Sequence, residues 1–192
     1  MFNDRYGLTK AVLDGTKTMT RRIIPLTDAD KTYLDTAFDW DLRERVIIDR
    51  YAKYKVGEVV AVAQSYKSVF EETLNYALPR YHWLDDHIDD KGFGNKLFVK
   101  ASEMPHQIQI TDVKIERLQD ISDEDCLKEG VVYDSRHWVN GYEVENLWNK
   151  IDRQSHFRSA QVAFANLINS IIGKGTWVSN PYVFAYSFKL LK

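Results

Sequence analysis

The spacing of apolar residues near the start of the chain predicts a short helix followed by a strand. Apolar residues recur there at helical intervals, at Leu8, Ala11 and Val12. Gly15 stands where a residue in the left-handed conformation would end that helix. The alternating, β-branched run of residues 18–24 then predicts a strand, which Pro25 ends. The pattern therefore predicts a helix-to-strand junction around residues 15–18.

Three more strands are predicted in the middle of the chain. They cover residues 59–63, which follow Gly57, and then residues 97–100 and 106–118. The apolar positions of the last strand change parity partway along it, from Ile108 and Ile110 to Val113 and Ile115. Such a change predicts a β-bulge or a bend, as closed or half-closed sheets use.

Two stretches interrupt this pattern, and we interpret both as insertions. Residues 27–50 are rich in charged side chains, with helical character over residues 41–51. Residues 67–96 mix aromatic and acidic side chains with Pro79 and two glycines. We expect this second stretch to be an insertion or a lid packed on the core.

The C-terminal half predicts three helices and a long strand. Ser122 is a typical N-cap, acidic residues fill the turn that follows it, and Gly130 provides the stop. Apolar residues at helical spacing mark two further helices, over residues 144–151 and 157–171. In the strand over residues 182–190 every second residue is apolar, which is typical of the wall of a barrel or sheet.

These elements predict a single α+β domain over residues 1–192, with a curved sheet of mixed strands and helices around it. The net charge of −2, from 26 basic and 28 acidic residues, argues against a broad surface that grips duplex nucleic acid. A local pocket is compatible with that balance. The single cysteine, Cys126, excludes an internal disulfide and a multi-cysteine metal site.

The chain carries no pattern that would direct it to a membrane. Its first residues lack the apolar run of a signal peptide. The longest purely apolar stretch, Val59 to Ala63, is too short to cross a bilayer. We therefore expect a cytoplasmic protein without a membrane partner.

The predicted helix-to-strand junction concentrates one lysine, two arginines and three threonines in Gly15-Thr16-Lys17-Thr18-Met19-Thr20-Arg21-Arg22. Cations, hydroxyls and backbone N–H groups together make a receptor for an anion or a carbonyl oxygen. Lys17 and Thr20 would point to opposite faces of a plain strand, so they share a pocket only if residues 16–18 form a turn. The alternative is a solvated edge strand.

The same eight residues fit the G-x-K-x-x-T-x-R signature of the ASCH domain, a relative of the PUA RNA-binding fold. The chain most resembles the subgroup found in phage and prophage genomes. Further stretches similar to that subgroup are Tyr54 to Glu58, Met104 to His106, Glu116 to Asp125, Glu129 to Gly130, and Trp177, Asn180 and Pro181. The resemblance leaves out residues 27–50 and 67–96. The chain also departs from the subgroup at Ala61, Ala63 and Gln64, where a tryptophan and an Arg-Glu pair are usual.

The resemblance implies a PUA-like β-barrel with a cleft beside the Gly15 to Arg22 loop. Many ASCH domains are regarded as RNA binders, and some small bacterial members resemble amidohydrolases that deacylate N4-acetylated cytidine with Lys, Thr and Glu. Carried over to this chain, the catalytic residues are Lys17, Thr20 and Glu129. The other ligand-binding residues are Gly15, Thr18, Arg21 and Arg22. The implied ligand is RNA or a small nucleoside, without a cofactor or a metal.

Helix chemistry alone does not favour Glu129. A carboxylate in the last helical turn opposes the helix dipole, and Asp125 is a like charge one turn earlier. A nearby Lys17 would explain its presence; a partly exposed glutamate at a helix end is the alternative. In the implied mechanism Lys17 activates the Thr20 hydroxyl, Glu129 protonates the leaving amine, and Arg21 or Arg22 steadies an oxyanion.

We interpret the chain as a domain whose cleft recognises a nucleobase or modified nucleoside, free or within RNA, and the sequence leaves open whether it also hydrolyses an amide there. Two readings compete with this interpretation. One is a non-catalytic RNA-binding module, and the other is a phage accessory protein with a vestigial pocket. A metal site is a separate possibility that the sequence does not favour. The histidines and aspartates of the second insertion follow no known ligand spacing and are better explained as a solvated acidic loop; they are His82, Asp85, Asp86, His87, Asp89 and Asp90.

Overall fold

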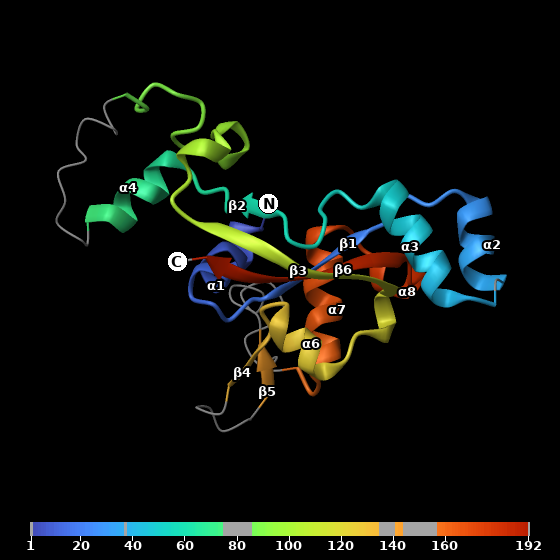
Figure 1. Ribbon diagram of the computed structural model, residues 1–192. Coiled ribbons are helices and arrows are strands. Elements are labelled where there is room, and N and C mark those ends of the chain that lie inside the picture. The colour runs from blue at the N-terminus through green and yellow to red at the C-terminus, as the bar shows by residue number, and fades with distance from the viewer. Residues whose placement is uncertain (1, 37, 75–85, 135–140, 144–156, 192) are drawn as a thin grey trace.

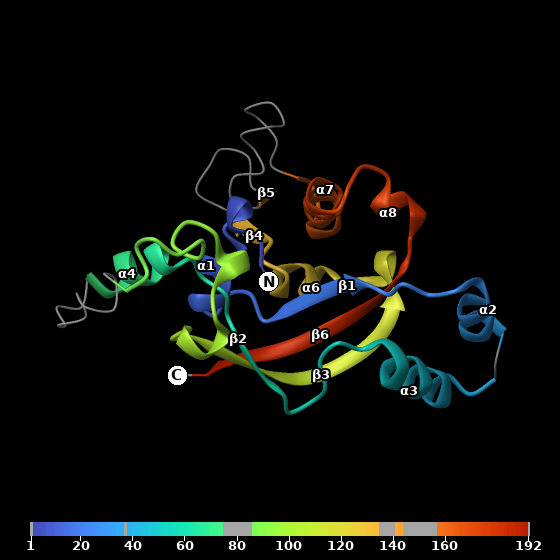
Figure 2. The same cartoon turned by 90° about the horizontal axis from the view of Figure 1, so that it is seen from above.

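A curled antiparallel sheet of four strands forms the centre of the computed structural model (Figure 1). The structure describes residues 2–36, 38–74, 86–134, 141–143 and 157–191. In sheet order the strands are β1 (Met19–Ile23), β6 (Tyr182–Leu191), β3 (Gln107–Arg117) and β2 (Val59–Ala61). Each strand runs antiparallel to its neighbours, and the sheet bends into a half-barrel (Figure 2). The α+β class is confirmed, whereas the prediction of mixed strands is wrong for the described strands.

A bulge in β3 explains why its apolar residues change parity. The pairing of β3 with β6 shifts register between Ile110 and Asp112. The extra residue returns the second apolar pair to the face that carries the first pair. Ile108, Ile110, Val113 and Ile115 consequently belong to one buried cluster. The predicted bulge is confirmed.

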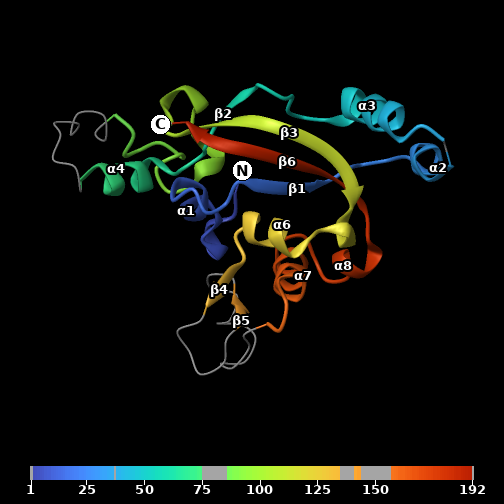
Figure 3. The same cartoon turned by 60° about the horizontal axis from the view of Figure 1, so that its bottom comes forward.

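Strand β6 is buried on both faces and separates two hydrophobic cores. On one face, Tyr182, Phe184, Tyr186 and Phe188 pack in the cluster that includes Leu34 and Ile47. On the other face, Val183 belongs to the cluster built from α6 (Asp123–Lys128) and α7 (Ala160–Ile171). Both helices lie on the same side of the sheet (Figure 3). This double burial is typical of a central strand.

Seven α-helices surround the sheet in the described part of the chain. The remaining ones are α1 (Leu8–Leu13), α2 (Asp28–Thr36), α3 (Trp40–Tyr51), α4 (Tyr66–Leu74) and α8 (Thr176–Ser179). Helices α2 and α3 lie at one end of the sheet and α4 at the opposite end (Figure 1). A small second sheet pairs β4 (Val132–Asp134) with β5 (Gly141–Glu143). The two stretches interpreted as insertions therefore contribute helices at opposite ends of the sheet.

Local sequence signals located several of these elements correctly. Gly15 follows α1 with a φ of +76°, and Gly130 follows α6 with a φ of +100°. The Ser122 side chain accepts a hydrogen bond from the backbone N–H of Asp125, as an N-cap does. The strand predicted over residues 18–24 is β1, and the helical character over residues 41–51 corresponds to α3.

Other predictions were wrong or fall outside the described residues. The strand expected over residues 97–100 is absent from the described chain, where two 3₁₀ turns, Lys96–Phe98 and Ala101–Glu103, stand instead. The Asn95 side chain caps the first turn by accepting a hydrogen bond from the backbone N–H of Leu97. This hydrogen bond favours the turn over an extended conformation. Strand β2 is shorter than predicted and lies at a sheet edge, which leaves Val59 48% exposed. The helix predicted over residues 144–151 lies outside the described residues.

The predicted helix over residues 157–171 starts later than expected. Phe157 pairs with Tyr142 as an isolated β-bridge, and Ser159 caps the helix, which begins at Ala160. In the described ranges, no helix combines the length and the apolar character needed to cross a membrane.

One buried carboxylate ties α2 to α3. Asp30 accepts hydrogen bonds from the backbone and the hydroxyl of Thr27, from the Tyr51 hydroxyl at 2.6 Å and from Arg50 at 2.7 Å. The hydrogen bonds from Thr27, followed by that from Tyr51, lower the pKa of Asp30 from 3.8 to about 2. A carboxyl whose pKa is lower in the folded state stabilises that state above its unfolded pKa.

Asp30→Asn should therefore lower the thermal midpoint at pH 7, and the difference from wild type should shrink as the pH falls from about 4 to about 2. The measurement is thermal unfolding of both proteins across that range. Asp49→Asn is the matched control, because Asp49 is an exposed aspartate on α3, the helix to which Asp30 binds. A difference between Asp30→Asn and wild type that does not change with pH would contradict the assignment.

Candidate functional site

A tight turn after α1 carries Lys17 and Thr20 into one cleft. Gly15 begins the turn, and the backbone N–H of Lys17 then donates to the Ala11 carbonyl at 2.9 Å. The N–H of Thr18 donates to the Lys128 carbonyl at 3.0 Å, which fixes the turn against the end of α6. The chain therefore enters β1 directly beside the C-terminal end of α6.

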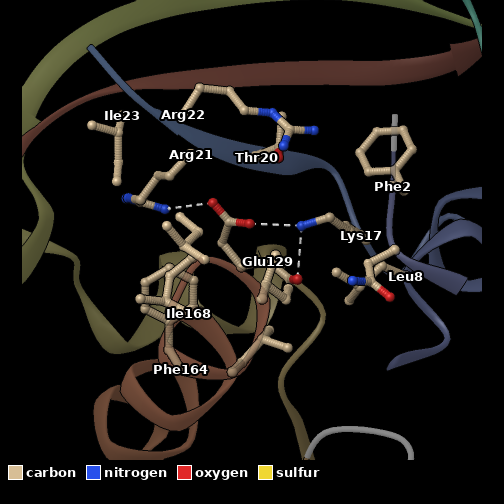
Figure 4. A pocket seen from close by; sticks show the side chains of 14 residues that line it. Phe2, Leu8, Lys17, Thr20, Arg21, Arg22, Ile23, Glu129, Phe164 and Ile168 are labelled. Carbon is tan, nitrogen blue, oxygen red and sulfur yellow. Dashed lines mark hydrogen bonds and ion pairs between the residues drawn. The ribbon is translucent and has the colours of Figure 1, made fainter. Parts of the chain in front are cut away.

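The Lys17 ammonium lies at the floor of the cleft, and its side chain is 2% exposed. It donates to Oε2 of Glu129 at 2.6 Å, to the Glu129 carbonyl at 2.7 Å and to the Met19 carbonyl at 2.7 Å (Figure 4). An ammonium has three N–H donors, so all of them are used. Burial lowers the pKa of Lys17, and the Glu129 carboxylate opposes that effect. The three acceptors favour the ammonium, whereas burial favours the neutral amine that the implied mechanism requires.

Glu129 is clamped between two cations. Its second carboxylate oxygen accepts from Arg21 at 3.1 Å, while the first accepts from Lys17. The residue is 4% exposed, so the alternative of an exposed helix-end glutamate is wrong. Gly130 follows directly, and a side chain there would approach Leu8 to 3.1 Å. Glycine at this position therefore leaves room for the Leu8 side chain of α1.

Arg21 is buried and bound to carboxylates from two directions. It donates to Glu116 of β3 at 2.7 Å and to Asp125 of α6 at 3.2 Å, in addition to Glu129. The cross-strand partner of Arg21 in β6 is Ala185, whose small side chain lets the guanidinium reach across to β3. Arg21 therefore fixes the position of Glu129, and its donors are engaged by protein groups instead of facing a ligand.

The cleft has a volume of about 240 Å³ and one apolar wall. That wall comes mainly from α7, with Phe164, Leu167, Ile168, Ile171 and Ile172. Lys17, Arg21 and Glu129 form the charged floor, Thr20 and Arg22 lie on β1, and Phe2 lies beside Lys17 (Figure 4). Thr20 is half-buried in the lining of the cleft, and Arg22 is exposed at it. The side chains of Thr20 and Arg22 therefore border the cleft above a buried ion pair.

Two of the predicted ligand-binding residues do not line this cleft. Gly15 provides the turn, and Thr18 bonds through its backbone to Lys128 and Phe188. Sequence reasoning missed the role of Glu116, which is the partner of Arg21 on β3. The sequence feature that could have indicated this role is the polar pair Lys114 and Glu116. These residues lie two apart on one face of a strand whose other face is apolar.

The acidic loop of the second insertion forms a separate cluster. His87 stacks on Tyr66 with ring centroids 4.0 Å apart, and its Nδ1 lies 2.7 Å from Asp90. His82 and Asp85 lie outside the described residues. Within the part that is described, no three potential metal ligands of the His, Cys, Asp and Glu types gather in one place.

Comparison of the chain with protein-family models, with curated proteins and with solved structures finds no match. The assignment of the site therefore depends on the sequence signature and on the geometry described above.

Arg21→Met should destabilise the protein by about 3–5 kcal/mol, because it leaves three carboxylates without the guanidinium they share. Urea unfolding measures this loss. Arg45→Met is the matched control: it removes the same group from an exposed position of α3 and should change stability by no more than about 0.5 kcal/mol. Equal losses in the two variants would show that the buried network does not hold the fold.

Proposed function

We propose that the chain is an ASCH-type domain that binds a nucleobase or modified nucleoside in the cleft. We further propose that Lys17, Thr20 and Glu129 hydrolyse an N-acyl amide there, such as that of N4-acetylcytidine. The observation that carries the proposal is the buried Lys17–Glu129 pair, 2.6 Å apart, in a cleft that Thr20 also lines. The signature of residues 15–22 supports it, since the three residues are those that the resemblance implies.

The size and lining of the cleft suit a small planar ligand. At about 240 Å³ it lies just below the range of roughly 300–1,000 Å³ that is usual for drug-sized ligands. The α7 side chains offer an apolar wall against which a ring can pack. Arg22 offers guanidinium donors for a carbonyl or an anionic oxygen. A nucleoside combines such a ring with polar edges.

The Lys17–Glu129 ion pair can supply both the base and the acid that hydrolysis of an amide requires. Transfer of one proton from Lys17 to Glu129 produces an amine and a carboxylic acid, and a desolvated site favours this neutral pair more than water does. The Lys17 amine then takes the Thr20 proton as the hydroxyl oxygen attacks the acyl carbon. Arg22, which lines the cleft beside Thr20, steadies the oxyanion.

Collapse of the tetrahedral intermediate completes the acyl transfer. The C–N bond breaks, and Glu129 gives its proton to the leaving amine, which restores the ion pair. Water then hydrolyses the acyl-threonine ester, which releases the carboxylic acid and the free Thr20 hydroxyl. Each cycle consumes one water and returns both charged residues to their starting state.

Thr20→Val should lower kcat/KM for acetate release from N4-acetylcytidine by at least about 10³-fold, since the nucleophile is lost while the size of the side chain is kept. Thr18→Val is the matched control. It has the same chemistry and is also half-buried, but it does not line the cleft, so its activity should equal that of wild type. Turnover by Thr20→Val at the wild-type rate would contradict the mechanism.

A non-catalytic RNA-binding module is the second candidate. It is favoured by the three acceptors around Lys17, which hold the ammonium form and oppose its use as a base. A protein of this kind would bind the ligand in the same cleft without releasing acetate.

If the chain is an RNA-binding module, its affinity for a short single-stranded RNA should decrease only slightly as the salt concentration rises, because few cations border the cleft. Arg22→Gln should weaken binding and reduce the slope of log affinity against log salt by about 0.7, the value for one phosphate contact. Fluorescence titration between low and moderate salt measures both slopes. Lys31→Gln, on α2, is the control and should leave the slope unchanged. An affinity that Arg22→Gln does not alter would exclude phosphate binding at the cleft.

A further inference from the structure

A second hollow, of about 230 Å³, lies on the face of the sheet that carries Ile108, Ile110, Tyr186 and Phe188. All four strands of the half-barrel line it, including both edge strands: Thr20 and Arg22 of β1, Val60 and Ala61 of β2, Ile108 and Ile110 of β3, and Tyr186 and Phe188 of β6. Two edge strands of a four-stranded sheet can border one small hollow only because the sheet is curled. The hollow is therefore built by the half-barrel itself.

Aromatic rings form much of the wall of this hollow. Tyr54 meets Tyr186 edge to face at 5.8 Å, and Phe2 meets Phe188 at 5.6 Å. The Tyr186 hydroxyl accepts the backbone N–H of Lys53 at 3.2 Å, and burial raises the pKa of this phenol, which is therefore neutral at pH 7. A neutral, ring-lined hollow is suited to a planar aromatic group.

Small residues on one side leave the space open. Ala61 and Ala63, at β2 and just beyond it, line the hollow together with the rings of β6. Both are half-buried, so a larger side chain at either position would extend into the space. The volume of the hollow thus depends on short side chains as well as on the curl of the sheet.

Every charged residue that lines the hollow is basic. These residues are Arg22 and Lys53, both exposed, and the Lys53 ammonium lies 5.4 Å from the centre of the Tyr54 ring. Exposed cations beside aromatic rings are the combination with which proteins hold the backbone and the bases of single-stranded nucleic acid. The hollow therefore suits a ring attached to an anionic group.

The hollow and the cleft share three residues. Phe2, Thr20 and Arg22 line both spaces. Strand β1 is an edge strand, so side chains near its free edge can border a space on either side of it. Arg22 in particular stands between a cleft with a charged floor and a hollow with aromatic walls. A ligand with two rings joined through a phosphate would place its anion beside Arg22.

We propose that the second hollow is a subsite for a second base, so that the preferred ligand is a dinucleotide unit of a single strand. This inference rests on the proposed function, because it places the modified base in the cleft. The neighbouring base lies in the hollow against Tyr54 and Phe2. The phosphodiester between the two bases lies beside Arg22 and Lys53.

Calorimetric titration at low salt tests the inference with N4-acetylcytidine and with dinucleotides that carry this nucleoside at the 5′ or the 3′ position. The dinucleotide with the correct order should bind about 10- to 100-fold more tightly than the nucleoside, as one stacked base and one phosphate contact would give. Ala61→Leu, which fills the hollow, and Lys53→Gln should each remove most of that advantage. Neither should change the affinity for the nucleoside.

Lys55→Gln is the matched control, because Lys55 is exposed two residues along the chain and does not line the hollow. It should keep the full preference for the dinucleotide. Nucleoside binding without a preference for either dinucleotide would overturn the second subsite and leave the proposed function standing. A preference that survives in both Ala61→Leu and Lys53→Gln would also overturn it. No binding of nucleoside or dinucleotide would overturn the proposed function together with this inference.

Discussion

The buried ion network at the junction of β1 and α6 is the interaction on which the rest of the site depends. Lys17 and Arg21 are nearly inaccessible to water, and isolated charges in that position would destabilise the fold by several kcal/mol, about the cost of breaking a buried pair. Carboxylates from two separate elements, Glu116 of β3 and Asp125 and Glu129 at α6, compensate them. The network therefore joins strands β1 and β3 to helix α6. It also holds the charged side chains at the floor of the cleft in place in the absence of a ligand.

Small residues make this network possible. Ala185 stands between Arg21 and β3, so the guanidinium can cross the central strand. Gly130 leaves room for Leu8 beside Glu129. Preorganisation of this kind lowers the entropic cost of binding, because the charged side chains are already held in place. It also constrains the chemistry, since a lysine that serves three acceptors must first lose a proton before it can act as a base.

The edge position of β1 has a different consequence, which concerns the shape of the ligand. Thr20 and Arg22 project from a strand with a neighbour on one side only, and they border both the cleft and the second hollow. A closed barrel would pair this edge and separate the two spaces. The half-barrel leaves them adjacent, so a single ligand can contact the charged floor on one side and the aromatic wall on the other.

The sequence by itself determined the local elements of this protein. Gly15 and Gly130 after their helices, Ser122 as an N-cap and the change of parity in β3 are short-range signals, and each corresponds to the observed backbone. The sequence also pointed to a link between Lys17 and Glu129, through the ASCH signature and through the unfavourable place of Glu129 at a helix end. Strand direction, the short edge strand β2, the commitment of Arg21 to Glu116 and the second hollow were decided only by the tertiary structure. Those features depend on which residues meet across a curled sheet from distant parts of the chain, and local propensity and spacing carry no information about such contacts.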